Sequence, residues 1–184
     1  LGNNMFAYCN NNPVLYTDPA GYYPLEAAFD FLNEWLFGDG EDQNFEEGSR
    51  IVEQLKQSKS MQALIDEAIE NCKKGIATTS GTHEFKPGED GYELYLSAQH
   101  VDYTIIVKKQ EISFTFLSLQ VKMTRYTAIV QVHDTYNFDE YRAWDSFGNT
   151  MNNLAYSYYL LGGGNDYEWY ATYTYSTNWE YDIS

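Results

Sequence analysis

The first part of the chain carries apolar residues at a helical spacing. From Pro24 to Phe37 they recur every three or four positions, so that one face of a helix would be apolar and the other polar. Gly38-Asp39-Gly40 then interrupts the pattern, because glycine is a poor helix former. This segment is predicted to be an amphipathic helix that packs its apolar face against a core.

Two more helices are predicted before residue 76. Asn44 as N-cap, with Glu47 three residues later, has the arrangement of a capping box, so a helix is expected from about Phe45. Another is expected from Ser60 to a stop at Lys73-Lys74-Gly75, since cations in the last turn and a glycine after it are typical of a helix end.

After Gly75 the pattern changes to the alternation of half-buried antiparallel strands. Four runs have apolar side chains at every second position: Tyr92, Leu94 and Leu96; Tyr103, Ile105 and Val107; Ile112, Phe114 and Phe116; and Tyr126, Ala128, Val130 and Val132. A late helix is expected from Met151 to Leu161 and a last strand from Tyr167 to Tyr175. The predicted class is α+β, with an N-terminal helical segment of about three helices followed by an antiparallel β domain with one late helix.

The chain is strongly acidic, with a formal net charge of −16. Its Lys and Arg residues all lie between Arg50 and Arg142. Because nucleic-acid binding depends on cations that contact phosphates, a nucleic-acid partner is disfavoured. No run of about 18 apolar residues occurs, so no transmembrane segment is expected.

Residues 1–24 contain closely spaced turn signals, Asn-Asn-Pro followed by Asp-Pro-Ala-Gly. The stretch Phe6-Ala7-Tyr8-Cys9-Asn10-Asn11-Asn12-Pro13-Val14, with Asp18-Pro19-Ala20-Gly21 behind it, resembles the end of the RHS repeat-associated core domain of YD-repeat polymorphic toxins. That family has Tyr-x-Tyr-Cys-x-Asn-Asn-Pro-Val before Asp-Pro-x-Gly. Phe6 in place of the usual Tyr is the one departure in the first stretch.

The resemblance implies an architecture and a biological role. Residues 1–24 would end the RHS core, residues 25–76 would form a helical segment, and residues 77–184 would form an antiparallel β toxin-like domain. In that family the core closes a shell around a variable C-terminal toxin, and an Asp that corresponds to Asp18 takes part in self-cleavage. The expected partners are that shell and a cognate immunity protein. The expected location is secreted or cell-surface associated, as part of a larger protein delivered to a target cell in bacterial competition.

The segment from His133 to Arg142 is the best candidate for chemistry. It follows a predicted strand and combines an imidazole, two aspartates, two phenols and a guanidinium, and catalytic groups are often held at such strand ends. His133, Asp134, Tyr136, Asp139 and Arg142 are therefore candidate catalytic residues for hydrolysis of a phosphate-containing target. The alternative is structural, with turn formers at Asp134 and Asn137, core aromatics at Tyr136 and Phe138, and a surface pair between Arg142 and Asp139.

The run Asp134-Thr135-Tyr136-Asn137-Phe138 also resembles the Asp-x-Tyr-Asp-Phe motif of colicin M type bacteriocins. That similarity implies Mg²⁺-dependent hydrolysis of the undecaprenyl-pyrophosphate linkage of lipid II. Two departures are present, because Asn137 replaces a carboxylate of the motif and no His follows Arg142. The cofactor is therefore left open, with Mg²⁺ as the candidate and no metal ligands assigned.

The sequence is compatible with three functions: an effector hydrolase, a toxin nuclease, and a non-enzymatic tail that binds carbohydrate or a partner. The third depends on the 18 tyrosines, since a strand with Tyr167, Trp169, Tyr173 and Tyr175 could offer a wet stacking face. The alternative is that tyrosine is simply favoured in strands. His83 and His100 have no nearby metal spacing and are expected to be strand-edge or turn residues.

Overall fold

The computed structural model describes residues 26–138 and 146–183, and its class is α+β, as predicted. The helices are α1 (Glu26–Phe37), α2 (Arg50–Gln57), α3 (Lys59–Lys73), α4 (Pro87–Asp90), α5 (Tyr92–Ser97) and α6 (Ser146–Leu160). The strands are β1 (Gln43–Phe45), β2 (Thr78–Glu84), β3 (His100–Phe116), β4 (Leu119–Tyr136), β5 (Tyr167–Ser176) and β6 (Glu180–Ile183).

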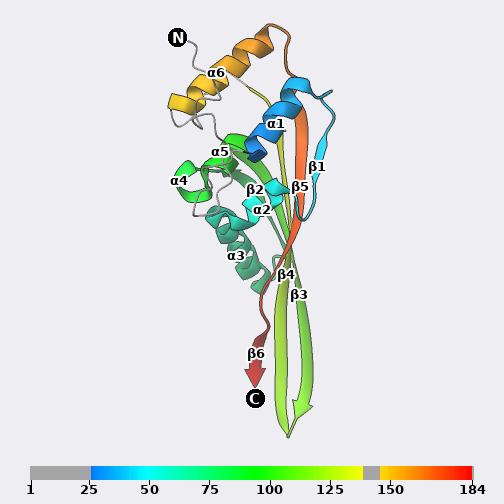
Figure 1. Ribbon diagram of the computed structural model, residues 1–184. Coiled ribbons are helices and arrows are strands. Elements are labelled where there is room, and N and C mark those ends of the chain that lie inside the picture. The colour runs from blue at the N-terminus through cyan, green and yellow to red at the C-terminus, as the bar shows by residue number, and fades with distance from the viewer. Residues whose placement is uncertain (1–25, 139–145, 184) are drawn as a thin grey trace, which may run out of the picture.

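The strands form one sheet in the order β1-β5-β4-β3-β2, and β6 pairs with β4 beyond the end of β5 (Figure 1). The β2–β3, β3–β4, β4–β5 and β4–β6 pairs are antiparallel, which confirms the predicted arrangement of β3, β4 and β5; strands β2 and β6 were not predicted. The short strand β1 pairs with β5 in parallel, which the sequence pattern did not predict. The sheet is therefore mixed.

Two of the first three helices match the prediction, and one differs. Helix α3 begins after Ser58, whose hydroxyl accepts a hydrogen bond from the Met61 amide at 3.1 Å. The helix expected from Phe45 instead begins at Arg50, and Asn44 lies in β1. Tertiary contacts explain the difference. The Phe45 ring stacks on Phe31 at 5.3 Å, and its backbone is held extended because it pairs with β5. These contacts outweigh a local capping signal.

The first predicted strand is also a correction, because Tyr92, Leu94 and Leu96 lie in or beside a helical turn, α5. Leu94 and Tyr95 are adjacent in sequence and both fully buried. A strand would have directed them to opposite faces of the sheet. The alternation of three apolar residues was therefore a coincidence of spacing.

A single hydrophobic core joins the helical segment to the sheet. Helices α2 and α3 bury Val52, Leu55 and Met61 against it, and α1 contributes Phe31, whose ring meets Trp169 of β5 edge to face at 5.3 Å. On β4 the core-facing residues are the even-numbered ones from Tyr126 to Val132. The odd-numbered ones face the opposite side of the sheet, here called the open face.

Strands β3 and β4 form one long hairpin that extends beyond the helices (Figure 1). Its register has no bulge from Asp102↔His133 to Phe116↔Leu119. The runs at 103–107 and 112–116, which alternation showed as separate, belong to the same strand. Only the first of them packs in the core, because Ile112, Phe114 and Phe116 are exposed.

Candidate functional site

The end of β4 directs its polar side chains to two different sides of the sheet. Asp134 and Tyr136 continue the even-numbered, core-facing row of this strand. His133 and Thr135 belong to the odd-numbered row on the open face, where Glu168 and Tyr170 of β5 lie beside them. The sequence candidates are therefore divided between two surfaces, because neighbouring residues of a strand alternate.

Asp134 lines a cavity of about 350 Å³ at this end of the sheet. Its walls come from α5, from the start of β3, from the end of β4 and from α6: Leu96, Ser97, Gln99, His100, Asp134, Thr135, Tyr136, Asn137, Phe138 and Asn152. The volume lies within the range of small-molecule sites. The wall combines apolar side chains with hydroxyls, amides, one imidazole and one carboxyl, so a ligand could be both enclosed and oriented.

Burial raises the pKa of Asp134 to about 7. A hydrogen bond from the backbone of Thr135 and the imidazole of His133 act in the opposite direction, whereas the nearby carboxylates of Glu168 and Asp102 raise the pKa further. At neutral pH the carboxyl is then present in both its protonated and its ionised form. A group in this state can both donate and accept a proton, which is what general acid–base catalysis requires.

Tyr136 forms part of the wall and of the core. Its ring meets Phe31 at 5.3 Å and Phe138 at 5.4 Å, edge to face in both cases. Burial raises the pKa of its phenol, so the side chain stays neutral under physiological conditions. It can shape the cavity or donate a hydrogen bond, but it is not an available base.

On the open face, His133 belongs to a separate polar group. Its Nε2 lies 2.6 Å from Glu168 Oε2, and the Thr135 hydroxyl donates to Glu168 Oε1 at 2.8 Å. The imidazole also stacks on Tyr170 at 4.6 Å. These contacts hold His133 in place away from the Asp134 cavity. The two residues therefore do not act as one catalytic pair in this geometry.

The remaining candidates have different outcomes. Asp139, Arg142 and the possible self-cleavage residue Asp18 lie outside the described residues. On β5, the side chains of Tyr167, Trp169 and Tyr173 are buried in the core and Tyr175 is half-buried. The expected wet stacking face is thus not formed by these four residues. The exposed row of β5 instead contains Tyr170, Thr172 and Thr174.

Sequence reasoning did not assign Ser97, Gln99, His100 and Asn152 to the site. His100 was expected to be a strand-edge residue, and it does begin β3. The β3–β4 register brings it beside the end of β4, so that it lines the same cavity as Asp134. That register could have been inferred only from the position of the hairpin turn, and Leu117-Ser118 is not a recognisable turn sequence.

Comparison of the chain with protein-family models, curated proteins and solved structures finds no match to any of them. In the described part of the chain, no group of three or more His, Cys, Asp or Glu side chains is placed to hold a metal ion. No helix among the described residues is long and apolar enough to cross a membrane.

Proposed function

We propose that this chain is the C-terminal effector tail of a bacterial RHS-repeat protein used in interbacterial competition, and that it is a hydrolase. The observation that carries the enzymatic part is the Asp134 carboxyl, which lines a cavity and has its pKa raised to about 7. The similarity of residues 1–24 to the RHS core supports the biological part. The same similarity brings in the shell of the parent protein, a cognate immunity protein and delivery from a secreted or surface-associated precursor.

In this proposal Asp134 transfers protons during bond cleavage. The ionised carboxylate accepts a proton from the attacking water, and the protonated carboxyl donates one to the leaving oxygen. Ser97, Gln99 and Asn152 on the same wall orient the substrate through their hydroxyl and amide groups. His100 lies at the same cavity, with Nε2 3.4 Å from Glu84 Oε1, and when protonated supplies positive charge.

The proposed target is a phosphate-containing molecule of the bacterial envelope. Support for this comes from the similarity of residues 134–138 to the colicin M motif and from Arg142, which follows in sequence and could hold an anionic group. The cavity's described lining includes one carboxylate, Asp134. A raised pKa makes that group a weak ligand for Mg²⁺, which prefers ionised carboxylates. These residues do not fit a Mg²⁺ site, so no step is assigned to the metal.

A toxin nuclease is the second candidate, since it needs the same acid–base group. The net charge of −16 argues against it. The described lining of the Asp134 cavity also includes no Lys or Arg, whereas nucleases depend on such cations to hold the phosphate backbone.

Growth of bacteria that express the chain in the cytoplasm or in the periplasm tests the proposal. The wild type is expected to arrest growth in at least one compartment, and the periplasm is expected for an envelope target. Asp134→Asn should restore growth by at least about a hundredfold in colony count, as loss of a general acid–base group reduces rate by a similar factor. Asp66→Asn on the exposed side of α3 is the matched control and should stay toxic.

The His133→Ala variant tests whether the open face of β4 contributes to toxicity. Because His133 lies on the open face with Glu168, this variant should also stay toxic. The proposal fails if folded Asp134→Asn, verified by circular dichroism, arrests growth as the wild type does. DNA degradation in the arrested cells would contradict an envelope target and would support the nuclease instead.

A further inference from the structure

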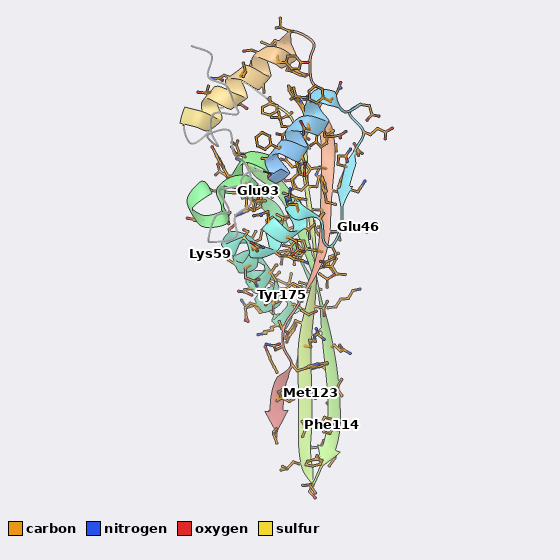
Figure 2. All side chains as sticks on the ribbon, viewed as in Figure 1. Glu46, Lys59, Glu93, Phe114, Met123 and Tyr175 are labelled. Carbon is orange, nitrogen blue, oxygen red and sulfur yellow. The ribbon has the colours of Figure 1, made fainter. Side chains whose placement is uncertain are left out.

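The distal part of the β3–β4 hairpin has one apolar and one polar face. Three cross-strand pairs on its open-face side are apolar: Ile112↔Met123, Phe114↔Val121 and Phe116↔Leu119. Strand β6 adds Tyr181 beside Met123 and Ile183 beside Val121. Figure 2 shows Phe114 and Met123 on the part of the hairpin that extends past the helices. No described element covers these side chains, and six of them are among the exposed large hydrophobic residues of the described part of the chain.

The turn of this hairpin also exposes an apolar side chain, and the backbone conformation there is unfavourable for it. Leu117 and Ser118 have φ angles of +48° and +70°, which is the type I′ geometry that Asn-Gly adopts without strain. A leucine is unfavourable there, because its side chain crowds the backbone at positive φ. Leu117 is nevertheless present and 82% exposed. In the described part of the chain that side chain is left in solvent, which favours a role in a contact with something outside the chain.

The acidic side chains of the distal hairpin and of β6 are confined to one face, whereas cations lie on both faces. Arg125 lies on the apolar side next to the Ile112↔Met123 pair, and Lys108 lies on the same side one pair nearer the body. The acidic residues lie on the polar side, where Glu111 binds Lys109 at 2.9 Å and Lys122 at 2.7 Å, and where Glu180 and Asp182 pair with Thr124 and Lys122. Arg125 also lies over the ring of Trp179, 6.0 Å from its centroid. Along the apolar face, from the body of the protein to the hairpin turn, the side chains are therefore first cationic, then aromatic and finally fully apolar.

This order matches the surface of an anionic lipid bilayer. Lys and Arg bind acidic headgroups, Trp and Tyr favour the interface, and aliphatic and Phe side chains favour the acyl region. We propose that the hairpin docks on an anionic lipid surface, with the Ile112–Leu119 face buried at the interface and Lys108 and Arg125 on the headgroups. The polar face stays in water. An orientation along the surface also keeps the open edge of β3 out of the hydrocarbon, where unpaired backbone groups are excluded.

The acidic body does not prevent this contact. Along β3 the next acidic residue on this face is Asp102, six residues from Lys108, or about 20 Å at the rise of a strand. That is more than the screening length of about 8 Å at physiological ionic strength. The membrane therefore meets the local positive charge of the hairpin rather than the net charge of the molecule.

Co-sedimentation with vesicles tests this proposal. The full chain is mixed with vesicles of phosphatidylcholine alone, or with about a third phosphatidylglycerol. Binding is expected to the anionic vesicles and to fall as salt is raised. Leu117→Asn with Ser118→Gly installs the preferred turn and removes the apolar tip, so it keeps the hairpin while reducing binding about tenfold. Lys108→Gln with Arg125→Gln should abolish the preference for anionic vesicles.

Leu161→Asn is the matched control, since Leu161 is 86% exposed but lies after α6; it should bind as the wild type does. Asp134→Asn should also bind unchanged, so failure of the proposed hydrolase and failure of membrane docking can be told apart. Absence of binding to anionic vesicles overturns the proposal, as does equal loss in the Leu161 and Leu117 variants. If the Leu117 variant instead changes the sedimentation coefficient of the free protein, the hairpin face is an interface with a second copy and not with lipid.

Discussion

Asp90 and Asp134 are both withdrawn from water, and their pKa values move in opposite directions. Burial acts to raise the pKa of Asp90, but hydrogen bonds from the Ser60 and Ser58 hydroxyls and from the Lys86 and Ser60 amides outweigh it and lower the pKa. Asp134 accepts a hydrogen bond from the backbone of Thr135, which offsets burial only in part, and its pKa rises to about 7. The number of donors around a buried carboxyl thus decides the direction in which its pKa moves.

Asp90→Asn is expected to destabilise the protein by about 2 kcal/mol at pH 7, because an amide cannot accept all four hydrogen bonds and places its own donors against others. The folded pKa of Asp90 is lowered, so its contribution to stability is present above the unfolded value near 4 and is lost as the pH falls through the folded pKa. Urea denaturation of wild type and variant at pH 7 and pH 3 measures this. The exposed Asp66→Asn serves as control, and an equal difference at both pH values would contradict the prediction.

The sequence identifies Asp134 as a candidate site residue, but it does not show which residues surround its side chain. A polar residue directly after an apolar strand run is visible in the sequence. Its separation from His133 follows from strand alternation, which directs neighbouring residues to opposite faces of the sheet. The approach of Ser97, His100 and Asn152 depends on how α5, β3 and α6 meet. No local pattern records such long-range contacts.

Among the elements, those with long periodic patterns were predicted and those set by tertiary contact were not. Helix α3 and strand β5 follow their apolar periodicity. Strand β1 contradicts a capping signal because Phe45 packs on Phe31 and its backbone pairs with β5. Helix α5 replaces a predicted strand, and its turn places both Leu94 and Tyr95 in the protein interior. Short segments carry too few residues for their own pattern to decide.

The turn between α6 and β5 shows how close packing fixes an element. Gly164 has a φ of +78°, and a Cβ atom there would overlap the ring of the fully buried Trp35. Gly164→Ala is therefore expected to cost about 2 to 3 kcal/mol in free energy of unfolding, from positive φ and steric overlap together. Thermal denaturation measures the loss.

Gly162→Ala provides the control for that substitution. Its φ is +83°, but nothing lies within 4 Å of the position that a Cβ would take. Gly162→Ala should lower the free energy of unfolding by about 1 kcal/mol, which is the contribution of the positive φ angle alone. Equal losses in the two variants would mean that contact with Trp35 does not fix this turn.

In the molecule as a whole, the helical segment and the sheet share one core. Phe31 of α1, Leu55 of α2 and Met61 of α3 pack in the same cluster as Val130 of β4 and Trp169 of β5. The cavity depends on this assembly too, because its walls come from α5, from both strands of the hairpin and from α6. The raised pKa of Asp134 is thus a property of the folded chain and not of the 133–142 segment alone.

Titration of Asp134 by NMR tests the central claim most directly. The protein is labelled with ¹³C at aspartate carboxyls, and the spectrum of Asp134→Asn identifies the signal. The structure predicts a midpoint near pH 7, because burial disfavours the ionised form. A midpoint near 4, the ordinary value for aspartate, would show a solvated carboxylate and would contradict its assignment as the acid–base group.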